Sequence, residues 1–290
     1  MKLHMAVVTA MAVSLGGLGW LSRSWEPGES GLAPRDLALL EMFQVLGEPN
    51  PFASQERRDP PKPPPHSGWT SPLRSSCRVN DAVESRRLRS LLAALPDQAT
   101  RVPIHPSNYG DRFRVDAFGN PVNPTPKLVV LHETVYGIQS AINTFMTEHP
   151  NDDDQVSYHA LISLDGELVE LLDPVKRAFG AGNSAFDGRW VITNPRVRGS
   201  VNNFALHVSL ETPLDGEDDG PHHSGYSPQQ YDALAVLLAS WMKRFNIPFE
   251  NITTHRVVDL GGERADPRSF DWKALQVRLE NIGMLCRQSV

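Results

Sequence analysis

Three polar positions of this 290-residue chain have the types and surroundings of metal ligands. His132 ends the apolar run LVVL, where a side chain projects from a sheet edge into a loop-lined cleft. His255 and Asp266 share the loop 253–272. Two imidazoles and one carboxylate commonly bind zinc, and a catalytic site leaves the fourth position open for water. The pattern therefore indicates a zinc site, although spacing alone also fits ordinary polar residues at a strand end and in a loop.

The elements that must position these residues alternate between strands and helices from Lys127 onward. The helix at 227–245 is the most clearly marked, because Ser227 can cap it, Pro228 opens it and Gln230 completes a capping box. Strands interleaved with helices predict an α/β domain with a central sheet. The expected strands are 128–132, 158–163, 167–172 and 204–211, and the other expected helices are 137–149 and 271–282.

The strand at 204–211 shows a period of two. Phe204, Leu206, Val208 and Leu210 are apolar and should face helices, since alternate side chains point to one face of a sheet. The opposite face carries three polar residues, which makes it the candidate cleft face: His207, Ser209 and Glu211.

Four ordered motifs carry a resemblance to a known family. They are LVVLHET at 128–134, SYHALISLDGELVELLDPVKRAFGAGNS at 157–184, NNFALHVSLE at 202–211 and TTHRVVDLGGERADPRSFDW at 253–272. Together they resemble the zinc-dependent N-acetylmuramoyl-L-alanine amidases, which include phage amidases and the peptidoglycan recognition proteins.

The resemblance implies a mixed central sheet flanked by helices. It also implies that His132, His255 and Asp266 bind one zinc ion. A zinc ion lowers the pKa of its water to about 7 and polarises an amide carbonyl. Tyr158 matches a catalytic tyrosine of the phage-type members, whose hydroxyl would donate to the developing oxyanion. An aromatic residue that merely packs in a strand is the other interpretation of Tyr158.

Two positions depart from the family pattern. Ser209 stands where some members have a proton-transferring Glu, and Arg264 stands where others have Lys, two residues before the last ligand. Arg stabilises an oxyanion but is a poor acid, because its pKa exceeds about 12. We hypothesise that Glu211 or His207 takes over part of the missing role; otherwise both residues line a solvated sheet edge.

Further polar residues have weaker assignments. Lys176 and Arg177 are candidate contacts for substrate carboxylates, with ordinary surface charge as the alternative. His159 is expected to be structural, while His222 and His223 are expected in a solvated loop.

The first 126 residues hold 16 of the 24 prolines, which predicts a loose N-terminal part before one compact domain. Residues 1–25 contain Lys2 followed by the uncharged apolar stretch 5–21, the layout of a secretory signal or a membrane anchor. Three further segments are expected: a proline-rich spacer at 26–75, a helical and extended region at 76–126 with a helix over 80–95 capped by Asn80, and the amidase domain at 127–285.

The overall charge and the cysteines narrow the functional classes. A formal net charge of −6 without clustered Lys and Arg argues against nucleic-acid binding. Export would permit one disulfide, between Cys77 and Cys286; two unrelated thiols are the alternative. We expect an exported monomer that is periplasmic, cell-wall associated or membrane-anchored.

The resemblance implies an amidase that cuts between N-acetylmuramic acid and L-alanine in peptidoglycan or muropeptides. A peptidoglycan-binding module without hydrolysis is the alternative from another class. A zinc hydrolase that acts on a different amide is a third.

Overall fold

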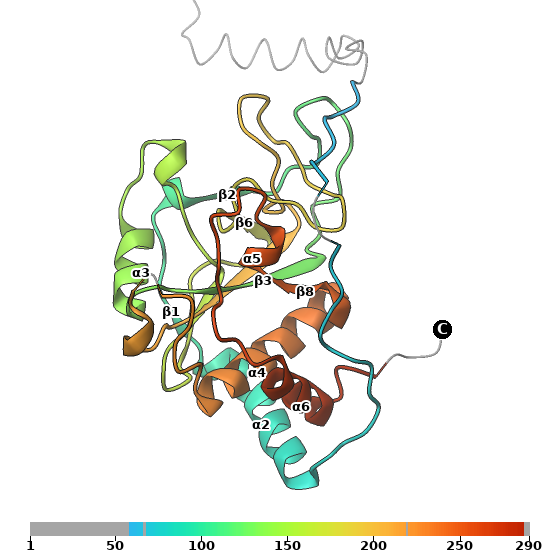
Figure 1. The fold of residues 1–290 in the computed structure, drawn as a ribbon, viewed down its shortest axis with the longest axis vertical. Coiled ribbons are helices and arrows are strands. Elements are labelled where there is room, and N and C mark those ends of the chain that lie inside the picture. The colour runs from blue at the N-terminus through green and yellow to red at the C-terminus, as the bar shows by residue number, and fades with distance from the viewer. Residues whose placement is uncertain (1–57, 66–67, 219, 287–290) are drawn as a thin grey trace, which may run out of the picture. The chain divides into compact units, whose positions relative to one another are not determined.

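The computed structural model describes residues 58–65, 68–218 and 220–286 (Figure 1). The expected signal or anchor at 1–25 and most of the expected spacer at 26–75 lie outside these residues. Among the described helices, none combines the length and the apolar character that crossing a membrane requires.

A mixed sheet forms the centre of the fold, as predicted, and it has six strands where four were expected. Its strand order is β1-β5-β4-β7-β3-β8, with β4 and β5 antiparallel and every other neighbouring pair parallel. A separate antiparallel pair joins β2 (Tyr109–Asp111) to β6 (Lys176–Ala178). The strands of the central sheet are β1 (Thr100–Arg101), β3 (Leu128–Glu133), β4 (Ala160–Ile162), β5 (Leu168–Glu170), β7 (Ala205–Leu210) and β8 (Ile252–Thr254).

Helices cover both faces of this sheet. In Figure 1, α2 (Ala82–Gln98), α4 (Pro228–Phe245) and α6 (Trp272–Ile282) lie together on one side of β3 and β8, whereas α5 (His255–Val258) lies on the other side. On the α5 side of the sheet, α3 (Ile138–Met146) packs Ile142 and Phe145 against Leu161 of β4. Four short 3₁₀ turns complete the described elements: Pro106–Asn108, Asp152–Asp154, Leu214–Gly216 and Phe249–Asn251.

The alternation predicted for β7 is confirmed over the strand itself. Leu206, Val208 and Leu210 are buried in the main core with the residues of α4 and α6. Phe204 differs from the prediction, because it precedes β7 and packs against the second cluster, which lies on the opposite face with Ala205. His207 and Ser209 are wholly buried on that opposite face.

The ends of α4 follow the predicted local signals. Ser227 Oγ accepts a hydrogen bond from the Gln230 backbone N–H, and the Gln230 side chain accepts one from the Ser227 backbone N–H. Asn246 ends the helix in the left-handed region, with φ of 53°. The capping box therefore holds the helix that covers the centre of the sheet.

The cap of helix α2 lies one residue later than predicted. Asp81, and not Asn80, caps it, since one Asp81 carboxylate oxygen accepts hydrogen bonds from the backbone N–H groups of Val83 and Glu84. Leu88 of this helix is buried in the main core. With β1 paired to β5, the region 76–126 belongs to the folded unit and is not a loose extension.

A disulfide joins Cys77 to Cys286. It closes a loop with a sequence separation of 209 residues and ties the segment before α2 to the segment after α6. The pairing that export would permit is therefore present, and the alternative of two unrelated thiols is excluded.

Removing this crosslink should destabilise the domain. In the chain-entropy model, closing a loop of this length stabilises by about 5 kcal/mol, because the crosslink restricts the unfolded chain. We expect the Cys77→Ser/Cys286→Ser double variant to lose up to that amount in denaturant unfolding. The Ser75→Ala/Ser76→Ala double variant is the control. A disulfide-free protein as stable as the oxidised one would contradict the expectation.

Candidate metal centre

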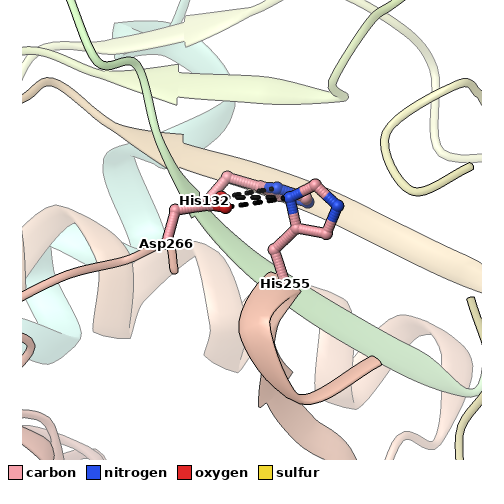
Figure 2. A group of neighbouring side chains, drawn as sticks. All are labelled: His132, His255 and Asp266. Carbon is pink, nitrogen blue, oxygen red and sulfur yellow. Dashed lines mark hydrogen bonds and ion pairs between the residues drawn. The ribbon is translucent and has the colours of Figure 1, made fainter. Parts of the chain in front are cut away.

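Three side chains from separate segments converge at the ends of parallel strands (Figure 2). His132 lies near the end of β3, and His255 follows β8 directly as the first residue of α5. Because β3 and β8 are parallel neighbours, their carboxyl ends meet at the same edge of the sheet. Asp266 reaches the pair from the loop after α5. The three residues predicted as ligands offer one atom each within 4.8 Å of one another.

The distances fit a single tetrahedral ion. Asp266 Oδ2 lies 3.2 Å from His132 Nδ1 and 3.2 Å from His255 Nδ1. Two ligands bound about 2.1 Å from a tetrahedral zinc ion are separated by roughly 3.4 Å. Two imidazole nitrogens and one carboxylate oxygen also match the ligand types that zinc prefers.

The protonation states fit a cation as well. Burial lowers the pKa of His132 to about 4, so its imidazole is neutral at pH 7. Burial alone would raise the pKa of Asp266, but its contacts with the His132 and His255 imidazoles outweigh burial and hold that pKa well below its usual range. A neutral imidazole and an ionised carboxylate are the forms that bind a metal ion.

Exposure differs among the three residues. The His132 side chain is 0% exposed, whereas the His255 and Asp266 side chains are 10% and 13% exposed. Solvent or a substrate therefore reaches the centre from the side of His255 and Asp266.

Tyr158 covers the buried ligand. Its ring stacks on the His132 ring, with the two ring centroids 4.3 Å apart. Phe145 packs edge-on against the Tyr158 ring. Burial raises the pKa of the Tyr158 hydroxyl, so the group keeps its proton at neutral pH. Tyr158 is thus a protonated donor next to a candidate ligand.

The positive charge of Arg264 acts on two residues of the centre. Its positive charge is one of the smaller causes that lower the pKa of His132 and oppose the rise in the pKa of Tyr158. The residue is exposed, and its backbone N–H donates to Asp259 Oδ2. Its predicted role in stabilising an oxyanion stays a prediction.

Ser209 lies beside His132 in the sheet. The two residues are register partners on β7 and β3, and both are wholly buried. Ser209 Oγ has no hydrogen-bond partner within the described part of the chain. The serine hydroxyl therefore occupies the strand position where some members of the family that the motifs resemble have a carboxylate.

Glu211 uses its carboxylate to hold backbone groups. Oε1 accepts a hydrogen bond from the Ile138 N–H at the start of α3, and Oε2 accepts one from the Leu164 N–H. An acidic group at a helix N-terminus is favourable because backbone donors there are otherwise unpaired. These contacts give Glu211 a structural task, and its role in proton transfer stays a prediction.

The two basic candidates lie on β6. Lys176 Nζ pairs with Asp111 Oδ1 at 2.6 Å, at the surface. Arg177 is stacked against Phe113 and Phe179, with 4.9 Å from its guanidinium carbon to each ring centroid. The charge of Lys176 is thus already matched by a carboxylate, and contact of either residue with a substrate stays a prediction.

His159 has the structural role expected for it. Its Nδ1 accepts a hydrogen bond from the backbone N–H of His207, and its Nε2 lies 3.2 Å from the carbonyl oxygen of Lys176. Both ring nitrogens are therefore used to hold neighbouring backbone segments.

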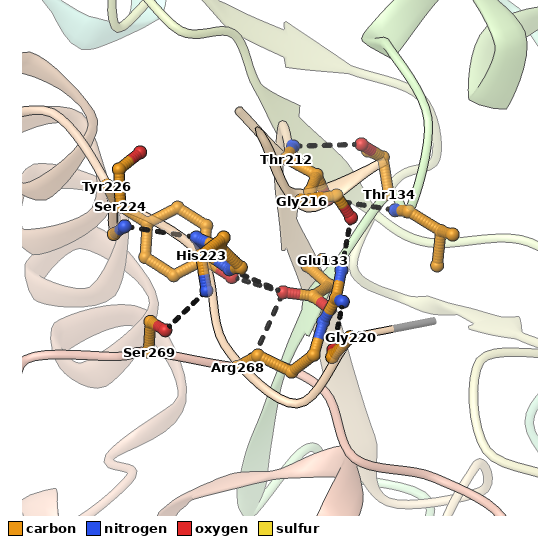
Figure 3. Close-up of polar contacts among 12 residues, drawn as sticks. Glu133, Thr134, Thr212, Gly216, Gly220, His223, Ser224, Tyr226, Arg268 and Ser269 are labelled. Atoms are coloured by element: carbon orange, nitrogen blue, oxygen red, sulfur yellow. Dashed lines mark hydrogen bonds and ion pairs between the residues drawn. The ribbon is translucent and has the colours of Figure 1, made fainter. Parts of the chain in front are cut away.

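A buried ionic cluster next to the centre was not predicted (Figure 3). Glu133 Oε1 accepts from Arg268 Nε, while Glu133 Oε2 accepts from the Arg268 backbone N–H and the Tyr226 hydroxyl. The Arg268 guanidinium also donates to the carbonyl oxygens of Asp218, Gly220 and Gly216. The cluster ties the ends of two ligand-bearing segments together, because Glu133 follows His132 and Arg268 lies two residues after Asp266.

His223 also belongs to this cluster, so its expected place in a solvated loop is wrong. Its side chain is 0% exposed, and its Nε2 lies 3.2 Å from Glu133 Oε2. The sequence alone does not distinguish His223 from its neighbour His222, so it gave no sign that His223 is buried. The only sequence signal for the cluster was a Glu directly after His132 and an Arg close to Asp266.

Breaking this cluster should be costly. Arg268→Met leaves the Glu133 carboxylate buried without its cation, and we expect a loss of about 3–5 kcal/mol in the free energy of unfolding. The matched control is Arg101→Met, which removes a surface pair with Glu170 and should cost no more than about 1 kcal/mol. Equal effects in urea unfolding would show that the cluster is not a stabilising element.

A comparison with protein families identifies the family of the chain. The family described as N-acetylmuramoyl-L-alanine amidase matches residues 122–269, about half of the chain. The chain belongs to this family.

Individual relatives are more distant. Similarity extends to the 1,6-anhydro-N-acetylmuramyl-L-alanine amidase AmpD of Citrobacter freundii, at 32% identity over 120 residues, which are 41% of this chain and 54% of that protein. The Escherichia coli K12 protein of the same name is 30% identical over 125 residues, 42% of this chain and 58% of that protein. The chain thus spans about half the length of the curated relatives it matches. A crystal structure of an AmpD derivative aligns with a TM-score of 0.47 and 27% identity, over 62% of this chain and 94% of that one.

Metal binding at the centre can be measured directly. We expect the purified protein to bind one zinc ion by calorimetry. Asp266→Asn should weaken zinc binding by more than about 100-fold, because it alters a ligand itself. Loss of a residue that only hydrogen-bonds to a ligand already lowers metal affinity by about 10–100-fold. The exposed Glu263→Gln, in the same loop, is the matched control. Unchanged zinc affinity in Asp266→Asn would place the metal elsewhere.

Proposed function

We propose that the protein is a zinc-dependent amidase that hydrolyses the bond between N-acetylmuramic acid and L-alanine in peptidoglycan or its fragments. The observation that carries the proposal is the convergence of His132, His255 and Asp266 at ligand distances inside the region that matches the family. The names of the curated relatives support a 1,6-anhydro muropeptide as the first substrate to test.

Each residue of the centre has its own role in the proposed reaction. His132, His255 and Asp266 would hold a zinc ion, whose Lewis acidity would polarise an amide carbonyl and make water a better nucleophile. The Tyr158 hydroxyl keeps its proton beside His132 and donates a hydrogen bond to the carbonyl oxygen as negative charge develops there. The charge of Arg264 adds electrostatic stabilisation of the same oxygen.

One observation favours a second candidate, a peptidoglycan-binding module without hydrolysis. Ser209 occupies the strand position beside His132 where a carboxylate would transfer protons. A hydroxyl is a poor base at neutral pH, so turnover would depend on other groups. The complete ligand set favours the enzyme, because a binding groove has no physical need for a zinc site with an open position.

We also propose that the protein acts outside the cytoplasm. The sequence of residues 1–25 has the layout of an export signal or anchor, and the Cys77–Cys286 disulfide is typical of proteins in oxidising compartments.

Turnover can be tested with a defined substrate. The zinc-loaded protein should release the stem peptide from 1,6-anhydro-N-acetylmuramyl tripeptide, measured by mass spectrometry, and a chelator should abolish the release until zinc is restored. Tyr158→Phe should lower kcat by about 10²–10³-fold, the usual cost of one oxyanion donor. Tyr136→Phe, which alters an exposed tyrosine, is the matched control. A zinc-loaded protein that binds the muropeptide without cleaving it would favour the binding module.

A further inference from the structure

His207 contacts the candidate centre without belonging to its ligand set. Its ring is wholly buried, and its Nδ1 lies 3.0 Å from Nε2 of His132. His132 therefore has a partner on each side of its ring, Asp266 at Nδ1 and His207 at Nε2. The register explains this contact: His207 pairs with Val130, two residues before His132 on the neighbouring strand, so both imidazoles point to the same face of the sheet.

The position of one proton links the two rings. A neutral imidazole carries its proton on one nitrogen and offers a lone pair on the other. His132 presents Nδ1 toward Asp266, another member of the candidate ligand set, so a metal ion bound by that set takes the Nδ1 lone pair and the proton must lie on Nε2. The atom 3.0 Å away, Nδ1 of His207, must then be the acceptor, and the proton of His207 lies on its Nε2.

The neighbours of His207 hold its backbone and confine its ring. Its backbone N–H donates to Nδ1 of His159. On the other side, the backbone of Gly180 lies against the ring, since a Cβ atom at position 180 would stand 2.5 Å from both Cγ and Nδ1 of His207. The space that a larger residue 180 would need is therefore filled by the imidazole.

Packing alone does not explain a histidine here. In the described part of the chain, His207 Nε2 is buried without a hydrogen-bond partner. A buried polar group without a partner costs about 1–3 kcal/mol, which an apolar ring of similar size would avoid. The hydrogen bond to His132 is the side-chain contact that requires a nitrogen at this position.

We propose that His207 is a positioning residue: its Nδ1 accepts a hydrogen bond from His132 Nε2–H and so holds His132 in the tautomer and orientation that presents Nδ1 to the metal ion. The inference rests on the proposed zinc site. Outer partners of this kind fix the tautomer and the ring orientation of ligating histidines in general. Here the partner is a second imidazole from the adjacent strand.

Zinc affinity tests the inference without any substrate. His207→Phe removes the acceptor while keeping an aromatic ring, and should weaken zinc binding by about 10–100-fold in calorimetry. His207→Asn keeps an acceptor oxygen near the position of Nδ1, and should restore most of the affinity. His149→Gln, which alters a histidine bonded to Asn108, is the control. Zinc binding by His207→Phe equal to that of the unaltered protein would overturn the inference.

A second pair of variants leaves His207 itself unchanged. Gly180→Ala should displace the His207 ring and lower zinc affinity in the same direction as His207→Phe. Gly182→Ala, where a Cβ atom has nothing within 4 Å, should bind zinc normally. Equal zinc affinities in these two variants would count against the inference, even if His207→Phe fails to fold.

The proton positions are also measurable. In the zinc-loaded protein, long-range ¹H–¹⁵N spectra should show a protonated Nε2 and an unprotonated Nδ1 for both His132 and His207. A proton on Nδ1 of His207 would overturn the inference, because two donors cannot share the 3.0 Å contact.

These outcomes separate the inference from the proposed reaction. A protein that binds zinc but cleaves no muropeptide would defeat the proposed activity, and the affinity series would still decide the role of His207. A protein that cleaves the muropeptide while His207→Phe retains full zinc affinity would defeat only the inference. A protein that binds no zinc would defeat both.

Discussion

The parallel pairing of β3 with β7 and β8 is the constraint on which the centre depends. It brings the carboxyl ends of three strands to one edge of the sheet, so His132, Ser209 and the start of α5 become neighbours although they are far apart in the chain. The same register places His207 close enough to reach the far side of the His132 ring. A shift of β7 by one residue would turn both His207 and Ser209 into the main core.

Burial and hydrogen bonding then determine the chemistry of this edge. Desolvation keeps His132 neutral and Tyr158 protonated, while the contacts with two imidazoles keep Asp266 ionised. The Glu133–Arg268 pair joins β3 to the loop that carries Asp266, so the ion pair and the candidate ligands share the same two segments. A buried charge pair of this kind is retained at a desolvation cost that its several hydrogen bonds must offset.

Local sequence patterns account for the part of the fold that was predictable. The alternation in β7 and the capping signals of α4 are local, and both features formed as expected except at Phe204. The region 76–126 contains the helix that was expected there, but its prolines gave no sign that the region packs into the folded unit. Leu88 and the pairing of β1 with β5 place it in the folded unit, which depends on contacts with residues more than sixty positions away.

The sequence by itself determined the α/β pattern, the candidate ligands His132, His255 and Asp266, and the family that the motifs resemble. Only the tertiary structure decided which polar side chains serve the centre and which hold the backbone. Glu211, His223 and Glu133 are ordinary polar residues in the sequence, and their tasks arise from hydrogen bonds to groups distant along the chain. The physical reason is that strand period assigns a residue to a face, whereas its partner depends on the strand or loop that the fold brings to that face.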